Sequence, residues 1–336
     1  MTRGFVVGKF YPLHKGHSFL IEEALRQSDA VTVAVCERSD QGISGETRAR
    51  WIKAIHPSVT VLVVADIMQD DDSAAWAKYT VQFLGYRPDK VFTSETYGET
   101  YARLLGAEHV LVDLKREHIP VSATMIRGDL YANWEYLHPI VRSYFVRRVV
   151  VVGAESTGTT TMSKALAEYF KTTWVPEFGR TYTEGKISSG TPWATGEFEF
   201  IADEQNRMED ALIGYADKLM FCDTDSWATD LWHERYLGAR SVSVAKRNAG
   251  KSDDLYLLTD VDIPFVQDGI RDGESIRHAM HARFREVLEK EQKPFIVLSG
   301  DHDVRLQMAI QECSELLSDN GAGFFESFPD RTRRYD

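Results

Sequence analysis

Short runs of branched apolar residues recur along the chain, and a segment with helical periodicity follows most of them. In the first half these runs cover residues 4–8, 30–36, 59–65, 90–94 and 109–113. Strands that alternate with helices form parallel sheets, because each helix carries the chain back across the sheet. The first half therefore predicts a doubly wound α/β domain.

The same alternation starts again near the middle of the chain. The strand-like runs of the second half cover residues 147–153, 218–223, 254–260 and 294–300. A chain of 336 residues is long enough for two domains of ordinary size. We therefore expect two doubly wound parallel-sheet domains, one over residues 1–146 and one over residues 147–336.

The net charge and the cysteines indicate which kinds of partner the protein binds and which cellular compartment it occupies. The net charge is −12, and so acidic a chain is a poor candidate for nucleic-acid binding. Cys36, Cys222 and Cys313 match no disulfide or metal spacing, which indicates a reducing cytoplasm. No apolar run is long enough to cross a membrane. We expect a cytoplasmic protein that acts on small molecules, and a homo-oligomer is compatible with this sequence. Weak periodicity predicts partial disorder over residues 319–336.

The loop after the first strand carries two histidines around a glycine. In "GKFYPLHKGH", His14 and His17 flank Gly16 at the expected start of a helix. The free N–H groups and the positive dipole end of a helix N-terminus attract phosphate. Imidazoles there can donate hydrogen bonds as charge develops on phosphate oxygens. The pair predicts a phosphate site. The alternatives are two exposed histidines without a function and a zinc site, for which suitably spaced further ligands are missing.

A second polar element follows the last strand of the first half. "VSATMIR" places Ser122, Thr124 and Arg127 at the start of another helix. Hydroxyl and amide groups suit a triphosphate, and a guanidinium can form two parallel hydrogen bonds with phosphate. On its own this segment could be an ordinary capped helix. Together with the histidine pair it predicts a nucleotide site.

The second half opens with a phosphate-binding loop. "GAESTGTTT" has Gly153 and Gly158 in the G-x-x-x-x-G spacing, between a strand and a helix. Backbone amides of such a loop surround phosphates, and Thr160 stands where a hydroxyl normally binds Mg²⁺. A plain turn rich in small polar residues is the alternative. The residues expected to contact the nucleotide are Gly153, Glu155, Gly158, Thr159, Thr160 and Thr161.

Further polar residues of the second half fit phosphoryl transfer. Asp223 and Asp225 follow a buried strand, where a doubly wound sheet places its ligands. One carboxylate would order Mg²⁺ and the other would accept the proton of a substrate hydroxyl, although either could simply cap a helix. Glu177 and Tyr182 suit a ribose and a flat cationic ring. A lid-like loop adds Asp268, Arg271 and Arg277.

The phosphate-binding loop departs from its usual sequence at one position. The usual lysine, which reaches the β- and γ-phosphates, is replaced by Thr159. Loss of this cation should slow phosphoryl transfer unless another residue replaces it. The candidates are Arg180, Arg271 and Arg277, whereas Lys164 is expected to point away from the phosphates. We favour a kinase that takes its cation from the lid. A domain that binds nucleotide without transferring phosphate is the alternative.

These motifs resemble those of a known family. "GKFYPLHKGH" and "VSATMIR" are similar to the nicotinamide mononucleotide adenylyltransferases of the nucleotidyltransferase superfamily. The whole chain resembles NadR-type bifunctional proteins, which join that enzyme to a ribosylnicotinamide kinase. The resemblance covers nearly all of residues 3–315. It implies a Rossmann-like nucleotidyltransferase domain over residues 1–146 and a P-loop kinase-like domain over residues 147–336. Some members carry an N-terminal helix-turn-helix repressor domain, which we do not expect before the first strand of this sequence.

The resemblance implies NAD salvage and biosynthesis, with ATP as substrate and Mg²⁺ as cofactor. The first half would join ATP to nicotinamide mononucleotide and release pyrophosphate, and the second would phosphorylate nicotinamide riboside. Arg48 and Trp51 would lie near the mononucleotide, or else Trp51 belongs to the core and Arg48 faces solvent. Two alternatives stay open, a regulatory second domain and a different phosphorylated acceptor for the first. The residues implied to hold ATP in the first half are Gly8, Lys9, Phe10, His14, Gly16, His17, Ser122, Thr124 and Arg127.

Overall fold

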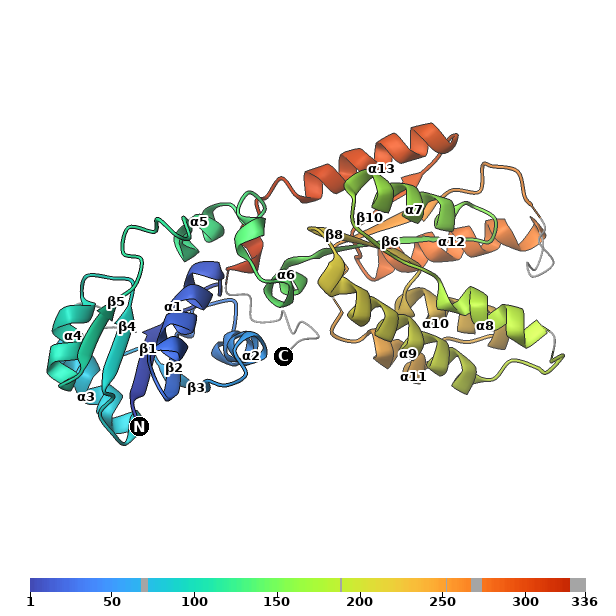
Figure 1. Ribbon diagram of the computed structural model, residues 1–336. Helices are drawn as coiled ribbons and strands as arrows, with labels where there is room; N and C mark the ends of the chain where they lie inside the picture. Colours follow the sequence, from blue (N-terminus) through green and yellow to red (C-terminus); the bar gives the residue numbers. More distant parts are fainter. Residues whose placement is uncertain (68–71, 188, 252, 267–273, 327–336) are drawn as a thin grey trace. The chain divides into compact units, whose positions relative to one another are not determined.

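The computed structural model describes the whole chain except residues 68–71, 188, 252, 267–273 and 327–336 (Figure 1). It divides into two compact units. The first comprises residues 1–144 together with residues 319–326, and the second comprises residues 145–318.

The first unit is built on a five-stranded parallel sheet in the order β3-β2-β1-β4-β5. The chain leaves β1 for β2 on one side and later returns to β4 on the other side. The carboxyl ends of β1 and β4 therefore flank the point at which the strand order reverses, which is where open α/β sheets bind ligands. The strands are β1 (Arg3–Gly8), β2 (Ala30–Glu37), β3 (Thr60–Ala65), β4 (Lys90–Thr93) and β5 (Glu108–Leu111).

Helices connect these strands and cover the sheet, and their apolar faces form the core. Phe5, Val91 and Tyr101, for example, are buried together between the sheet and the flanking helices. The helices are α1 (Lys15–Arg26), α2 (Gly45–Ile55), α3 (Ser73–Leu84), α4 (Gly98–Leu105), α5 (Ala123–Gly128), the short η1 (Trp134–Tyr136) and α6 (Pro139–Phe145).

Residues 319–326 belong to the segment for which we expected partial disorder, and they pack on the first unit. The backbone N–H of Leu130 donates to the carbonyl of Asn320 at 2.9 Å. Gly321 has a φ of 72°, and a Cβ there would lie 2.5 Å from the Leu130 side chain. Phe324, in the short helix η3 (Ala322–Phe324), is buried. The unit that begins the chain therefore also includes this late segment.

The second unit is a five-stranded parallel sheet in the order β10-β9-β6-β8-β7. Its central strand β6 (Arg147–Gly153) is buried along almost its whole length, as its run of valines indicates. The other strands are β7 (Thr173–Val175), β8 (Leu219–Asp223), β9 (Leu255–Thr259) and β10 (Phe295–Leu298). Only β7, which has three residues, was not expected from the sequence. The predicted fold class is confirmed for both units.

The helices of the second unit carry most of its polar site residues. Several begin at residues whose side chains cap the first turn, such as Asp225 and Asp301. The helices are α7 (Thr159–Phe170), α8 (Phe178–Ile187), α9 (Thr195–Leu212), η2 (Ile213–Tyr215), α10 (Ser226–Leu237), α11 (Val242–Asn248), α12 (Glu274–Lys290) and α13 (His302–Leu316).

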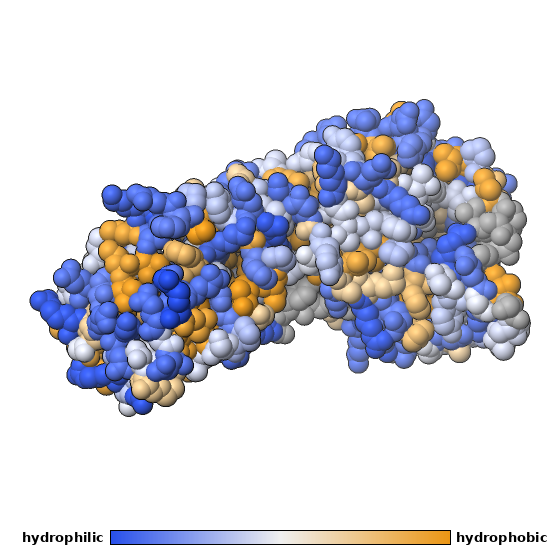
Figure 2. Space-filling view, viewed as in Figure 1, coloured by the Kyte–Doolittle hydropathy of each residue, from blue (hydrophilic) through white to orange (hydrophobic). Residues whose placement is uncertain are grey.

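The surface in view is a mosaic of hydrophilic and apolar side chains on both units (Figure 2). None of the helices in the described parts of the chain combines the length and the apolar character that a membrane crossing requires. The three cysteines are buried and none forms a disulfide.

Candidate active sites

A cavity of about 780 Å³ opens at the carboxyl edge of the first sheet. Because the strands are parallel, the segments that follow four of them meet there. Lys9 and Phe10 follow β1, Arg38 follows β2, Asp66 follows β3, and Glu95 follows β4. This is the position that the strand order predicts for a ligand.

The histidine pair lies at the N-terminus of α1, next to this cavity. His14 is the N-cap residue, and its Nδ1 accepts a hydrogen bond from the backbone N–H of His17 at 3.3 Å. The two rings stack with centroids 3.7 Å apart, and the His17 ring also packs against Phe10 at 4.9 Å. His17 lines the cavity, whereas His14 does not line it and stacks on the His17 ring.

Both imidazoles are held in the neutral form. Burial lowers the pKa of His14 to about 3, with a smaller contribution from the positive charge of Arg116. Burial also lowers the pKa of His17, helped by His14 and Arg116. His17 Nδ1 has no hydrogen-bond partner within the described protein. A neutral imidazole has one donor nitrogen and one acceptor nitrogen, so each ring can donate one hydrogen bond to an anion.

Arg127 joins the second motif to the first. Its Nη1 donates to the carbonyl of Tyr11 at 2.6 Å, its Nη2 donates to the hydroxyl of Thr124 at 3.2 Å, and its side chain lines the cavity. Ser122 caps α5 by accepting from the N–H of Met125. The two motifs therefore meet in space, although Ser122 and Thr124 support Arg127 and the helix and do not line the cavity.

The glycines and Lys9 complete this region. Gly8 and Lys9 line the cavity, and Lys9 Nζ lies 3.5 Å from the buried carboxylate of Asp66. A Cβ on Gly16 would lie 3.0 Å from the His14 ring. A side chain at position 16 would therefore press on the histidine stack.

Arg48 and Trp51 do not lie where the resemblance implied. Arg48 is completely buried and does not line the cavity. Its guanidinium donates to the carbonyls of Lys9, Cys36 and Ser44 and to the side chain of Gln41. Trp51 is buried against Tyr144, with ring centroids 5.4 Å apart. Trp51 is thus a core residue, and Arg48 fastens the loops after β1 and β2 to α2 instead of facing solvent or substrate.

Two aromatic residues that the sequence did not single out line the cavity instead. Trp76 comes from α3, and Tyr97 lies just before α4 with nearly half of its surface exposed. Trp76 belongs to none of the stretches that carry the family resemblance, whereas Tyr97 lies in one of them, VFTSETYGETYA. Only the fold brings the beginnings of these two helices to the carboxyl edge of the sheet.

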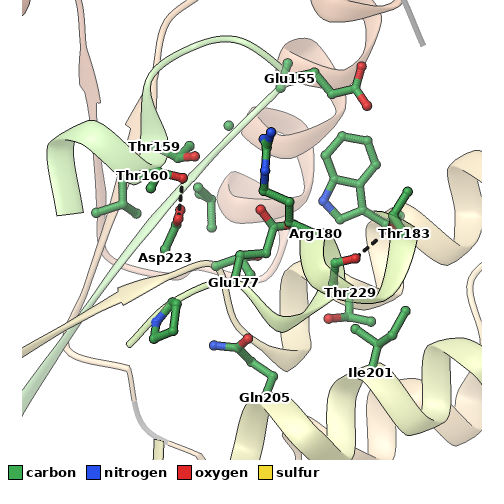
Figure 3. A pocket seen from close by; sticks show the side chains of 18 of the residues that line it. Glu155, Thr159, Thr160, Glu177, Arg180, Thr183, Ile201, Gln205, Asp223 and Thr229 are labelled. Atoms are coloured by element: carbon green, nitrogen blue, oxygen red, sulfur yellow. Dashed lines mark hydrogen bonds between the residues drawn. The ribbon is translucent and has the colours of Figure 1, made fainter. Parts of the chain in front are cut away.

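The second cavity has a volume of about 470 Å³ and lies at the carboxyl edge of the second sheet (Figure 3). The loop after β6, the end of β8, and helices α8, α9 and α10 line it. All the loop residues that we expected to contact a nucleotide take part in the lining, namely Gly153, Glu155, Gly158, Thr159, Thr160 and Thr161.

The loop after β6 has the backbone that phosphate binding requires. A Cβ on Gly153 would lie 2.1 Å from the hydroxyl of Thr259, so only glycine fits there. Gly158 has a φ of 88° at the N-terminus of α7. Inside the loop, the Thr157 hydroxyl donates to the carbonyl of Ala154 at 2.6 Å. Buried contacts thus fix the shape of the loop, and the face of the loop that lines the cavity can contact a ligand.

Two buried arginines hold the carbonyl groups of this loop. Arg277 Nη2 donates to the Ser156 carbonyl at 3.3 Å, and Arg305 Nη1 donates to the Thr157 carbonyl at 2.9 Å. Neither side chain lines the cavity. Arg277 was expected to contact substrate, and it supports the loop instead. Arg305 was not anticipated at all. Asp268 and Arg271 lie outside the described residues.

Asp223 and Thr160 form the polar centre of the cavity. The Thr160 hydroxyl donates to one carboxylate oxygen of Asp223, and the other oxygen is buried with no partner within the described protein. Burial raises the pKa of Asp223, while hydrogen bonds from Thr160 and Thr159 and the charges of Lys164 and Arg180 oppose the shift.

Glu177 stands beside Asp223 in the same cavity (Figure 3). Burial raises the pKa of Glu177, and the neighbouring charge of Asp223 raises it further. A carboxyl group whose pKa is shifted toward neutrality is suited to accept and release protons.

Asp225 and Tyr182 do not line the cavity. Asp225 is fully buried, caps α10 by accepting from the N–H of Ala228, and accepts a second hydrogen bond from the Tyr256 hydroxyl. The capping alternative therefore describes Asp225. The Tyr182 hydroxyl donates to Glu197, and its ring lies 6.1 Å from the ring of Trp193, which lines the cavity.

Aromatic side chains form one wall of the second cavity. Trp193, Phe198, Trp232 and Tyr236 all line it. The Trp193 ring packs on Phe198 at 5.0 Å and on Tyr236 at 5.2 Å. Such a wall suits a flat or cationic ring. Within the described residues, no group of three or more His, Cys, Asp or Glu side chains could hold a metal ion by itself.

Two family models match the chain, one to each unit. A model described as cytidylyltransferase-like matches residues 5–129, and a model described as an AAA domain matches residues 148–305.

Curated relatives match over long stretches. The trifunctional NAD biosynthesis/regulator protein NadR of Escherichia coli (strain K12) is 29% identical over 95% of this chain and 84% of its own length. A nicotinamide-nucleotide adenylyltransferase of Thermococcus kodakarensis is 26% identical over 53% of this chain and 100% of its own length.

Solved structures resemble the whole chain. A crystal structure of a NadR protein in complex with NR has a TM-score of 0.74 at 21% identity, covering 94% of this chain and 96% of the other. A second, in complex with NAD and AMP-PNP, has a TM-score of 0.75 at the same identity and coverage. The succession of the two units is thus a known arrangement of fold.

Proposed function

We propose that this chain, a NadR-type protein, serves NAD salvage and biosynthesis through two ATP-dependent activities. The first unit joins ATP to nicotinamide mononucleotide, and the second phosphorylates nicotinamide riboside to the mononucleotide. The similarity to NadR relatives, which extends over 95% of the chain, supports both activities. The observation that carries the proposal is a cavity in each unit, at the carboxyl edge of its sheet, that residues of a phosphate-binding motif line.

In the first reaction, a phosphate oxygen of nicotinamide mononucleotide attacks the α-phosphorus of ATP. The new P–O bond forms as the bond to the β-phosphate oxygen breaks, and pyrophosphate leaves. No protein nucleophile is needed, so the site acts by orientation and charge stabilisation. We assign His17 to a hydrogen bond with a triphosphate oxygen and Arg127 to the charge of the leaving group. His14 positions His17 through the ring stack.

We place the nicotinamide ring of the mononucleotide beside Trp76 and Tyr97, because both line the first cavity. A cationic ring is attracted to aromatic faces. Arg48 takes part indirectly, since its hydrogen bonds hold the backbone of Lys9 at the rim of the cavity.

In the second reaction, the 5′-hydroxyl of the riboside attacks the γ-phosphorus of ATP, and ADP leaves. We assign the hydroxyl proton to Glu177, whose raised pKa suits a general base. This is the role that the sequence suggested for one of the two aspartates. The aromatic wall of Trp193, Trp232 and Tyr236 would receive the nicotinamide ring.

We propose that Mg²⁺ accompanies ATP in the second site. The fit is good, because Asp223 has an unpartnered buried oxygen next to the Thr160 hydroxyl. Mg²⁺ is commonly bound by one or two protein oxygens together with substrate phosphates, which agrees with the lack of a complete protein cage among the described residues. When bound, the ion would neutralise phosphate charge.

A second candidate function rests on Thr159. A loop without its lysine could bind nucleotide as a sensor and transfer nothing. We favour the kinase because the cavity contains both Asp223 and a proton acceptor, Glu177, which a sensor does not need. We also propose that the protein works in the cytoplasm, since none of its three buried cysteines forms a disulfide.

One experiment separates these functions. The protein is incubated with Mg-ATP and either nicotinamide mononucleotide or nicotinamide riboside, and the products are separated by chromatography. We expect NAD and pyrophosphate from the mononucleotide, and the mononucleotide followed by NAD from the riboside. ATP binding by the second unit without riboside phosphorylation would make the sensor function correct. No dinucleotide from the mononucleotide would contradict the adenylyltransferase.

A further inference from the structure

The phosphate-binding loop of the second unit lacks its own cation, so the charge must come from elsewhere if phosphate is transferred. The predicted source was the lid. Arg271 lies outside the described residues, and Arg277 is buried against a loop carbonyl and does not line the cavity. Among the described residues that line the cavity, the basic side chains are Lys164 and Arg180.

Lys164 lies one turn beyond Thr160 on the same face of α7. It lines the cavity, contrary to the expectation that it points away, and its Nζ lies 4.4 Å from the centre of the Trp174 ring. This cation–π contact holds the ammonium group against the cavity wall formed by β7. An ammonium engaged there is less suited to reach phosphates cradled at the N-terminus of α7.

Arg180 is the other basic side chain that lines the cavity. It comes from the first turn of α8, and its guanidinium extends toward the loop residues Glu155 and Thr159 (Figure 3). Its Nε lies 3.5 Å from a carboxylate oxygen of Glu184, and its side chain is 42% exposed. The side chain therefore has room to move onto a ligand in the cavity.

The charge of Arg180 acts at the centre of the site. Burial raises the pKa of both Glu177 and Asp223, and the charge of Arg180 opposes both shifts; Lys164 opposes the shift of Asp223 more strongly but is not among the groups that act on Glu177. A group that influences both carboxylates is within electrostatic range of a phosphate bound between them and the loop. Arginine remains charged at all relevant pH values and can form two parallel hydrogen bonds with phosphate.

We propose that Arg180 replaces the missing loop lysine, binding the β- and γ-phosphates of ATP from α8 and stabilising the charge of the transferring phosphoryl group. This inference rests on the proposed kinase function and names the residue that completes it. The cation and the proton acceptor Glu177 then lie three residues apart on one segment.

The test combines removal of the arginine with return of the lysine. Riboside phosphorylation is measured in full-length protein for Arg180→Gln, Arg180→Lys, Thr159→Lys and the double variant Arg180→Gln/Thr159→Lys. We expect Arg180→Gln to lower kcat about 10²-fold or more, as for other groups that act on transition-state charge. Arg180→Lys should keep part of the activity. The double variant should recover at least about tenfold over Arg180→Gln, because the lysine returns a positive charge to the phosphate-binding loop.

Two controls make the result specific. Arg207→Gln removes an exposed arginine of α9, paired with Glu204, and should leave the rate unchanged. Lys164→Gln tests the rival cation and should cost less than Arg180→Gln. A loss below about threefold in Arg180→Gln, or a larger loss in Lys164→Gln, would overturn the proposal. So would a double variant no more active than Arg180→Gln. Thermal unfolding by circular dichroism would establish that each variant is folded.

A binding measurement separates failure of this proposal from failure of the kinase function. ATP and ADP affinities are compared in a His17→Ala/Arg127→Ala background, which weakens nucleotide binding by the first unit. Absence of riboside phosphorylation in the unaltered protein would contradict the kinase. Arg180 would still be expected to contribute to ATP binding more than to ADP binding. An ATP-to-ADP affinity ratio unchanged by Arg180→Gln would contradict the role of Arg180 in either case.

Discussion

The two proposed ATP sites are built from different parts of the chain. In the first, the candidate phosphate ligands are side chains, since His17 and Arg127 line its cavity from two motifs that meet in space. In the second, they are backbone groups, since the glycine-containing loop lines the cavity and buried arginines hold its carbonyls from outside. Point changes should therefore harm the two sites in different ways.

The largest expected effect is on the first site. His17→Ala removes a neutral donor that faces the cavity, so we expect dinucleotide synthesis to fall by about 10³-fold. Pyrophosphate release with nicotinamide mononucleotide as acceptor is the measurement. ATP binding and riboside phosphorylation by the second unit should survive and serve as the control. Full retention of dinucleotide synthesis would remove His17 from the site.

A change in the backbone of the second site should lower riboside phosphorylation and spare NAD formation. Gly153→Ala places a Cβ 2.1 Å from the Thr259 hydroxyl, so the loop must shift, and we expect riboside phosphorylation to fall by about 10²-fold while NAD formation from the mononucleotide is unchanged. Gly196→Ala is the matched control, because a Cβ there meets nothing within 4 Å.

The corresponding change in the first unit sharpens the contrast. Gly16→Ala brings a Cβ to 3.0 Å from the His14 ring, a closeness that a small movement relieves. We therefore expect a smaller loss of NAD formation than the loss of kinase activity in Gly153→Ala. An equal or greater loss in Gly16→Ala would show that the first site depends on its backbone just as strongly.

The sequence predicted the elements better than the side-chain positions. Period and length identify β6 and the helix after it, whereas β7 has only three residues and no alternation to detect. A helical pattern places Trp51 on an apolar face but does not reveal that Arg48 beside it is buried and satisfied by carbonyl groups. These hydrogen bonds of Arg48 depend on loops that are distant from it in sequence.

Arg305 illustrates the remaining limit. Its guanidinium bonds the carbonyl of Thr157 although the two residues are 148 positions apart, and no motif surrounds it. Asp225 shows the converse, because a residue with the right spacing for catalysis serves as a buried helix cap. Residue type and spacing locate a candidate site only where a residue of the motif itself lines the cavity, as His17 does.

A smaller effect should follow from the late segment that packs on the first unit. The Tyr11 hydroxyl donates to the Phe325 carbonyl at 2.6 Å and accepts from the N–H of Gly42 at 2.9 Å. Tyr11 belongs to the loop before His14 and lines the cavity. We therefore expect a chain that ends at Ser318 to lose about tenfold in NAD formation, because the Tyr11 loop loses this support.

A chain that ends at Glu326 is the matched control for this truncation, since it keeps every described contact of the segment and should retain NAD formation. The same reasoning applies to a fragment that ends near residue 146, the predicted boundary of the first domain. It should form NAD less well than the whole chain. Equal activity of the two truncated chains would show that residues 319–326 do not support the site.

The smallest effect concerns pH. Burial lowers the pKa of His14 to about 3 from an ordinary value of 6.5, so the unfolded chain binds a proton that the folded state excludes. The free energy of unfolding should therefore decrease as pH falls from about 6.5 toward 3, and it should be unaffected by this group above 6.5. His14→Gln, which keeps a polar side chain but cannot titrate, should show a shallower decrease. Denaturant titrations of both proteins at pH 5 to 7.5 measure the difference.

Because the imidazoles are already neutral at pH 6.5, NAD formation should show no step near the ordinary histidine pKa. Parallel decreases in stability for the two proteins would mean that His14 is charged in the folded state, and the site would then resemble a cationic phosphate clamp instead of a pair of neutral donors.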